Sequence, residues 1–81
     1  MSKIIITDKQ CRAARELLGW KQDDLCKASK ITKSTIADFE RGVRELRMGT
    51  LESIVDAFEK AGIRFENDKN EFGVKLIKKN N

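Results

Sequence analysis

Hydrophobic residues recur at helical spacing through the first sixty positions of the chain. Cys11, Ala14 and Leu18 are spaced i, i+3 and i+7, and Ile36 and Phe39 are three residues apart. A longer series at i, i+3, i+4, i+7 and i+10 comprises Leu51, Ile54, Val55, Phe58 and Ala61. Apolar residues at these intervals lie on one face of an α-helix. The pattern therefore predicts amphipathic helices that share one core.

Residues that favour helix ends divide this region into four helices. Thr7 and Gln10 have the spacing of a capping box, which predicts that the first helix begins here, and Gly19 is suited to end it. The second helix is predicted over residues 22–29 and the third over about 33–41. Only three or four residues separate these two helices, so a tight turn must join them.

The last part of the chain changes to a two-residue period. Apolar and polar residues alternate over 63–66 and again over 72–77, with turn-forming residues between them. This pattern predicts a C-terminal β-hairpin over residues 63–78. Because an isolated hairpin is marginal in water, we expect it to pack on the helices, to gain a third strand from Lys3–Ile6, or to pair its edge with a second copy.

Composition limits the class of protein. The chain has 81 residues, of which 40% are hydrophobic and 37% charged, which suits one small domain over residues 1–81 with a charged surface. No segment approaches the ~20 apolar residues of a membrane span or the ~7–15 of a signal-peptide core, so we expect a cytoplasmic protein. Residues 78–81 are polar and are expected to form a frayed tail.

The excess of positive charge is confined to one part of the sequence. The formal net charge is +4, and residues 1–50 carry 11 Lys and Arg against 7 Asp and Glu, whereas the rest of the chain is neutral. A basic region of this kind is the electrostatic signature of nucleic-acid binding. We therefore expect a polyanion to bind within residues 1–50.

Candidate catalytic and metal-binding residues are scarce. The chain contains no His, which removes the commonest general base and His metal ligands. Two cysteines supply half of the four ligands that a structural zinc site uses. We therefore expect no enzymatic activity, no metal and no cofactor. Cys11 and Cys26 lie among apolar residues and are interpreted as packed, reduced thiols; a reactive sensor cysteine is the alternative, and it requires exposure and a lowered pKa.

Three segments of the chain together carry a resemblance to a known family. They are Gln22–Cys26, Ile31–Ile36 and Phe39–Gly42. In their order and spacing, residues 8–62 resemble the Cro/repressor-type helix-turn-helix family of bacterial and phage regulators, also called the XRE family. The resemblance implies a mainly α, four-helix repressor-like domain to which the hairpin is added. It also implies that the helix over about 33–41 enters the major groove of DNA.

The resemblance assigns base recognition to the start of this helix. Thr32, Lys33, Ser34 and Thr35 occupy the end that enters the groove, and Lys33 and Ser34 are the foremost candidates for contacts with base edges. Asp38 lies one turn further along. Its carboxylate either accepts a hydrogen bond from a cytosine amino group or repels phosphate.

Other residues are implied to hold the DNA backbone. Gln22 matches the family's phosphate-binding Gln, and the alternative is an exposed residue at a helix start. Arg41, Arg44 and Arg47 precede the fourth helix, where the family often contacts phosphate; the alternative for each is a solvated surface charge.

Further positions concern the fold of the family rather than its DNA contacts. Arg15 and Glu40 align with an ion pair that joins the first helix to the recognition helix. The sequence departs from the family at Lys30, where Gly is common in the turn, so a non-glycine residue is expected at positive φ. It departs again at Cys26, where Ala is usual, although Cys is small enough for close helix packing.

The sequence thus predicts a sequence-specific regulator that binds double-stranded DNA, of the phage or prophage repressor type. We expect a homodimer that reads two half-sites, with its interface in the C-terminal region. One alternative is the antitoxin of a toxin–antitoxin pair, binding DNA through the same helix and a toxin through the hairpin. Another is a protein-interaction module that keeps the fold without DNA binding.

Overall fold

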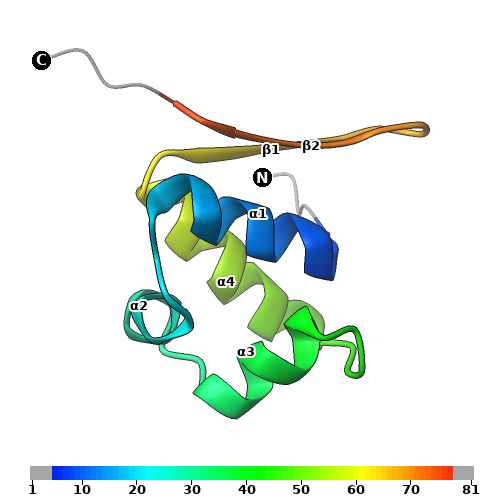
Figure 1. Cartoon of the computed structure of the whole chain (residues 1–81). Helices are drawn as coiled ribbons and strands as arrows, with labels where there is room; N and C mark the ends of the chain where they lie inside the picture. Colours follow the sequence, from blue (N-terminus) through cyan, green and yellow to red (C-terminus); the bar gives the residue numbers. More distant parts are fainter. Residues whose placement is uncertain (1–4, 78–81) are drawn as a thin grey trace, which may run out of the picture.

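The helical and alternating patterns fold into four helices followed by one antiparallel hairpin (Figure 1). The computed structural model describes residues 5–77. The elements in chain order are α1 (Asp8–Leu18), α2 (Gln22–Ser29), α3 (Lys33–Glu40), α4 (Met48–Lys60), β1 (Ile63–Asn67) and β2 (Phe72–Leu76). The predicted mainly α domain with a C-terminal hairpin is confirmed. The tail expected over residues 78–81 lies outside the described residues.

The ends of α1 follow from its flanking residues. The Thr7 hydroxyl accepts a hydrogen bond from the Gln10 amide at 3.1 Å, and Gln10 Oε1 accepts one from the Thr7 amide at 3.0 Å. This arrangement is the predicted capping box, which satisfies two amide groups at the helix start. Gly19 adopts φ 70° and ends the helix in the left-handed conformation, as predicted.

The fourth helix begins earlier than its apolar series. That series starts at Leu51, whereas α4 starts at Met48. Arg47 is extended at φ −64° and ψ 153°, and its carbonyl accepts a hydrogen bond from the Leu51 amide at 2.9 Å, which adds one turn before the first buried residue. No side chain caps this turn and it contains Gly49, a poor helix former, so the sequence carries no signal for it.

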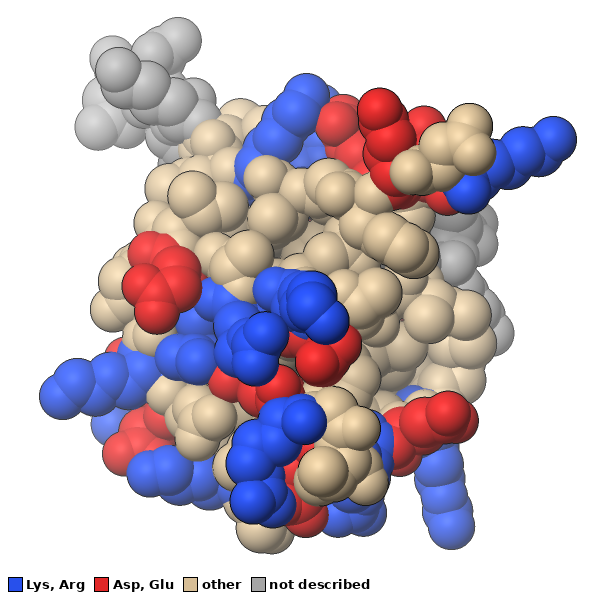
Figure 2. Space-filling model, turned by 45° about the vertical axis from the view of Figure 1, so that its right-hand side comes forward, with Lys and Arg blue, Asp and Glu red and all other residues tan. Residues whose placement is uncertain are grey.

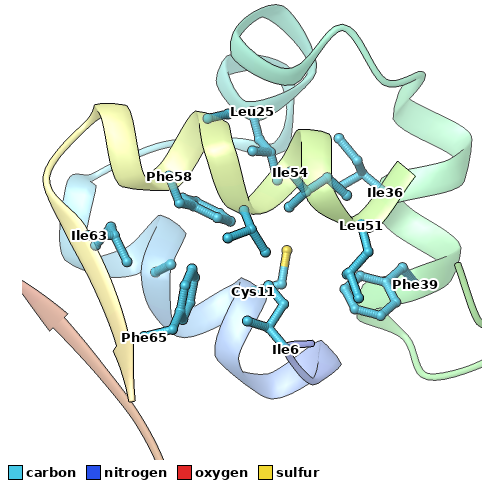
Figure 3. Packing of buried hydrophobic residues seen from close by; sticks show 13 residues of the cluster. Ile6, Cys11, Leu25, Ile36, Phe39, Leu51, Ile54, Phe58, Ile63 and Phe65 are labelled. Carbon is cyan, nitrogen blue, oxygen red and sulfur yellow. The ribbon is translucent and has the colours of Figure 1, made fainter. Parts of the chain in front are cut away.

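One hydrophobic cluster joins the helices and the hairpin. The labelled side chains in Figure 3 come from all four helices, from β1 and from the residue before Thr7, and they meet around Ile54 and Phe58 of α4. Phe58 stacks on Trp20 with ring centroids 5.8 Å apart and meets Phe65 edge to face at 5.9 Å. Aromatic pairs of this geometry add to the stabilisation from burial. The α4 helix is therefore the centre on which the other elements pack.

The hairpin lies across α1, on the side away from α2 and α3 (Figure 1). Asn67 and Gly73 receive hydrogen bonds from Gln10 Nε2 at 2.7 and 2.9 Å, which fix the hairpin to the start of α1. Of the segment expected as a third strand, Lys3 and Ile4 lie outside the described residues, and Ile5 accepts a hydrogen bond from the Asn67 side chain at 2.6 Å without forming a strand. Within residues 5–77 the sheet therefore contains β1 and β2 alone.

Candidate nucleic-acid interface

The turn between α2 and α3 fixes the position of the third helix. Lys30 adopts φ 62° and its amide donates to the Cys26 carbonyl at 2.8 Å, so the expected positive φ at a non-glycine residue is confirmed. The Ser29 hydroxyl donates to the Leu25 carbonyl at 2.7 Å and accepts from the Ile31 amide at 3.3 Å. These bonds hold both sides of the turn and leave little freedom at the start of α3.

The first turn of α3 presents polar groups to solvent. Thr32, Lys33 and Ser34 are exposed, and Thr35 is half-buried. The hydroxyls of Thr32 and Thr35 are bonded to each other at 2.8 Å, and Thr32 makes no side-chain cap to the helix. Hydroxyl, ammonium and uncapped backbone amide groups therefore lie together at one exposed helix end, which suits contact with phosphates and base edges.

Three of the predicted DNA-binding side chains are held in surface ion pairs. Lys33 Nζ lies 3.1 Å from Asp23 Oδ1 of α2, with exposed fractions of 62% and 63% for the two side chains. Arg41, the residue after α3, pairs with Asp38 of that helix at 2.5 Å. Exposed pairs of this kind contribute only ~0–1 kcal/mol, so a phosphate or a base edge can replace either carboxylate at little cost.

A shallow hollow separates the start of α3 from the loop before α4. It encloses about 420 Å³, and we call it the α3 hollow. Four predicted site residues, Thr32, Thr35, Arg44 and Arg47, line it together with Lys30 and Thr50. The structure thus gathers residues from two segments of the chain into one polar surface, in which three basic residues outnumber the one acidic residue, Glu45. Five predicted site residues do not line the hollow: Gln22, Lys33, Ser34, Asp38 and Arg41.

Sequence reasoning did not assign Lys30 and Thr50 to this surface. Lys30 is the turn residue at which the sequence departs from the family's Gly. Lys in place of Gly also adds a positive charge next to α3, and this charge is the signal that could have assigned Lys30 to the surface. Thr50 precedes the apolar series of the fourth helix, so it is assigned to the interface only once α4 is known to begin at Met48.

Gln22 has a bond toward the interior of the domain. Its side-chain amide Nε2 donates to Glu40 Oε1 at 3.0 Å. The amide nitrogen carries two hydrogens, so one stays available for another acceptor. Gln22 therefore lies where it can join the interface to the residues that hold α3.

Glu40 is the acceptor at the centre of a buried network. Arg15 donates to both of its carboxylate oxygens at 2.7 Å, and the Cys11 thiol lies 3.2 Å from Oε2. The side chains of Arg15 and Glu40 are 14% and 2% exposed. Arg15 also donates to the Trp20 carbonyl at 3.1 Å, and Arg12 donates to the Glu40 carbonyl at 3.0 Å. The network therefore connects α1 to the last residue of α3.

The network also sets the protonation states of its members. Burial would raise the pKa of Glu40, but the hydrogen bonds from Arg15, Gln22 and Cys11 outweigh it and lower that pKa below its ordinary value. The bond to Glu40 raises the pKa of Arg15. Burial raises the pKa of the Cys11 thiol and, with Asp23, that of Cys26. Neither thiol has the lowered pKa that a reactive sensor cysteine requires.

Basic side chains gather on the half of the molecule that contains α2 and α3, and a smaller mixed group of acidic and basic side chains lies at the top of the view (Figure 2). In Figure 2, which keeps the vertical direction of Figure 1, Lys and Arg dominate the middle and lower part of the surface and acidic groups lie between them. A broad area without charged side chains lies above them. The basic part of the surface is thus on the side of the domain opposite the hairpin.

Part of the chain matches a known protein family. A protein-family model described as Helix-turn-helix matches residues 12–61. The matched segment contains α2, the turn, α3, the α3 hollow and α4, and it stops before the hairpin. No curated protein matches the chain. Among the helices of residues 5–77, none has the length and apolar character needed to cross a membrane.

Proposed function

This chain belongs to the XRE-type helix-turn-helix family of DNA-binding transcription regulators, and from that membership we propose that it is a sequence-specific repressor of the phage or prophage type. In this proposal a homodimer binds double-stranded DNA with one α3 helix of each copy in the major groove. The observation that supports it best is the position of the exposed first turn of α3 beside the basic α3 hollow. No chemical step is part of the proposed function.

Base recognition is proposed for the first turn of α3. A helix that enters the major groove by its N-terminal end presents its first side chains to base edges. Lys33 donates to guanine O6 or N7, and the Ser34 hydroxyl accepts or donates. To make that contact, Lys33 exchanges the Asp23 carboxylate for a base or a phosphate.

Phosphate binding is proposed for the α3 hollow. Arg44 and Arg47 supply charge from the loop before α4, and Lys30 supplies it from the turn. These contacts add affinity that depends on salt and carry no sequence information. Gln22 and Arg41, which do not line the hollow, are proposed to add further backbone contacts.

The proposed role of the Arg15–Glu40 pair is to keep α3 at a fixed angle to the domain. Each donor to Glu40 comes from α1 or α2, so the carboxylate at the end of α3 is held from two helices. Base recognition requires side chains to be placed within fractions of an ångström, which a mobile helix does not provide. The pair thus acts on DNA binding through α3 and not by contact.

The first experiment is selection of binding sites from random double-stranded DNA, followed by affinity measurements on the selected and a scrambled sequence across a salt series. We expect a preference of ~10³-fold or more for the selected site. The Lys33→Ala and Ser34→Ala variants should reduce that preference. Arg44→Ala and Arg47→Ala should weaken binding to both sequences and lower the salt slope by about one each.

The matched control is Arg64→Ala, because Arg64 is an exposed arginine of β1, on the side of the domain away from α3 (Figure 1). It should leave affinity and preference unchanged. Equal, salt-sensitive binding to all sequences would contradict sequence-specific regulation. A lack of binding at low salt would favour the protein-interaction module instead, and a toxin that co-purifies with the chain would favour the antitoxin.

A further inference from the structure

The β2 strand carries large apolar side chains that its own domain leaves in solvent. Phe72 is 65% exposed and Leu76 is 43% exposed, whereas Ile63 and Phe65 of β1 are 3% and 4% exposed. Leu76 is the cross-strand partner of Ile63, and Val74 is the partner of Phe65, so these side chains lie on the same face of the hairpin. The helices therefore bury Ile63 and Phe65 of β1, whereas on β2 they pack against Val74 and leave Phe72 and Leu76 largely in solvent.

The backbone of the same strand has an open edge. The amide of Ile77 bonds to the Gly62 carbonyl at 2.7 Å, and the amide of Asp68 bonds to the Glu71 carbonyl at 3.0 Å. Because hydrogen-bonded pairs alternate along an antiparallel ladder, Gly73 and Lys75 also face β1. Three residues alternate with these along the strand, and their amide and carbonyl groups point away from β1; they are Phe72, Val74 and Leu76.

We propose that this edge of β2 pairs with the same edge of a second copy of the chain. The result is a four-stranded antiparallel sheet in the order β1-β2-β2-β1. The inference names the interface of the dimer, and in that respect it rests on the proposed function. Phe72, Val74 and Leu76 direct backbone groups away from β1, and Phe72 and Leu76 add exposed apolar side chains, which together form the surface that strand addition requires.

Charge disfavours one register of the pairing, and the apolar residues of β2 favour another, in which they lie opposite each other. With Val74 opposite Val74 of the second copy, Phe72 lies opposite Leu76, and Lys75 lies opposite Gly73, which has no side chain. A register centred on Lys75 would instead place two ammonium groups directly opposite each other, which is unfavourable. Lys75 keeps its bond to Glu66 of its own hairpin, 3.1 Å long, in the Val74 register.

A second hollow lies next to the proposed partner. It encloses about 460 Å³ between α1 and β2, and Gln10, Ala13, Phe72 and Val74 are among the residues that line it. In the Val74 register, Leu76 of the second copy lies beside Phe72 on the helix-facing side of the sheet. It therefore borders this hollow, where its side chain gains apolar contacts.

The pairing also orients the recognition helices. The two-fold axis of an antiparallel pair is perpendicular to the sheet, so the helices of both copies lie on the same side of the four strands. In Figure 1 the hairpin and α3 lie on opposite sides of the α1 and α4 helices. Both α3 helices therefore face away from the sheet, toward one side of the dimer, where a single DNA duplex can meet them.

The test is the mass of the full chain in the absence of DNA, measured by light scattering and sedimentation over a range of about 1 to 200 µM. The contact is small, so we expect a monomer–dimer equilibrium with a Kd of roughly micromolar order. The double substitution Phe72→Lys and Leu76→Lys should give a monomer throughout. Val43→Lys is the matched control, because Val43 is 68% exposed and lies in the loop after α3; it should leave the dimer intact.

Cross-linking tests the register. In a Cys26→Ser background, Val74→Cys should form a disulfide between copies on mild oxidation, because the two Cα atoms would be ~5.5 Å apart. Lys75→Cys should cross-link far more slowly, because its counterpart in the second copy is displaced by two residues along the strand and lies ~7–8 Å away. Circular dichroism should give native helical content for every variant, which keeps loss of the dimer separate from loss of the fold.

Several outcomes would overturn the interface. They are a wild-type monomer at all concentrations, a folded Phe72→Lys and Leu76→Lys variant that stays dimeric, and faster cross-linking through Lys75→Cys. A protein that binds specific DNA but remains monomeric would refute the interface and leave the DNA-binding function standing. A protein that dimerises through β2 without binding DNA would support the interface and refute the DNA-binding function.

Discussion

The side-chain amide of Gln22, the first residue of α2, donates a hydrogen bond to Glu40, the last residue of α3, at 3.0 Å. Arg15 of α1 binds both oxygens of the same carboxylate at 2.7 Å, so one acceptor joins three helices. The helix-turn-helix pair is therefore held at both ends, by the short turn at Lys30 and by Glu40 on the far side.

Replacing Gln22 should affect stability as well as DNA binding. Because hydrogen bonds to charged groups are worth ~1.5–3 kcal/mol and the site is only partly buried, Gln22→Ala should lower the free energy of unfolding by about 1–2 kcal/mol in urea denaturation. Gln22→Glu should cost more, since it places a second carboxylate beside Glu40. Equal stability of all three proteins would contradict this role.

Loss of Arg15 should be more severe. Arg15→Ala removes the cation that binds both oxygens of the buried Glu40 carboxylate, and breaking such a pair costs ~3–5 kcal/mol. That is a large share of the stability of a small domain, so we expect loss of the cooperative thermal transition. The control is Arg64→Ala on the exposed face of β1, which should stay within ~0.5 kcal/mol of the wild type. An unchanged melting midpoint for Arg15→Ala would refute the prediction.

Stability should fall in acid through Glu40. Its pKa is lower in the folded than in the unfolded chain, where it is near ~4.3, so its contribution is fully present above that pH. The contribution is lost as the pH falls from ~4.3 through the lower pKa of the folded state. Urea denaturation at several pH values below ~5 should show a steeper loss for the wild type than for Glu40→Gln. Parallel curves would show that another carboxylate is responsible.

The turn should become more stable with glycine at position 30. Lys30 occupies the left-handed region at φ 62°, which costs a non-glycine residue ~1–2 kcal/mol, and the greater freedom of glycine in the unfolded chain offsets about half of this. Lys30→Gly should therefore raise the free energy of unfolding by about 0.5–1 kcal/mol, measured in urea. Lys30→Ala removes the same charge but keeps the strain, so it should not stabilise. A gain of equal size in both variants would assign the effect to charge.

Removing Asp23 should strengthen DNA binding. The carboxylate holds Lys33 at 3.1 Å and adds negative charge beside the first turn of α3. Asp23→Asn should therefore increase affinity about 3- to 10-fold at low salt, and the gain should shrink as salt is added. Glu66→Gln makes the same change of charge on the hairpin and should have little effect. Weaker binding by Asp23→Asn would mean that the ion pair positions Lys33 for its contact.

Local signals account for most of the fold. Thr7 with Gln10 specifies the start of α1 through bonds between residues three apart, and the left-handed residues Gly19 and Lys30 mark where α1 and α2 end. The start of α4 was not accessible in this way, because the extended backbone of Arg47 has no side-chain cap to announce it. Sequence patterns thus locate an element end where a capping side chain or a recognisable turn residue marks it, and miss it where neither is present.

The surface could be predicted less completely than the fold. The family resemblance assigns Lys33 and Asp38 to DNA, but their ion pairs with Asp23 and Arg41 depend on which rotamers meet once the helices are packed. Likewise, nothing in the spacing of Thr35 and Arg44 indicates that they line one hollow; that follows from the path of the loop before α4.

The three hydrogen bonds of the Gln10 side chain join segments that are far apart in the sequence, and they should make those segments open together. The side chain that closes the first turn of α1 also bonds Asn67 and Gly73 of the hairpin, 57 and 63 residues away. When that turn opens, the hairpin loses its tether, so the two segments should open as one cooperative unit. Amide protons at the start of α1 and in β1 should then exchange with solvent at one shared opening free energy, below that of the α4 core.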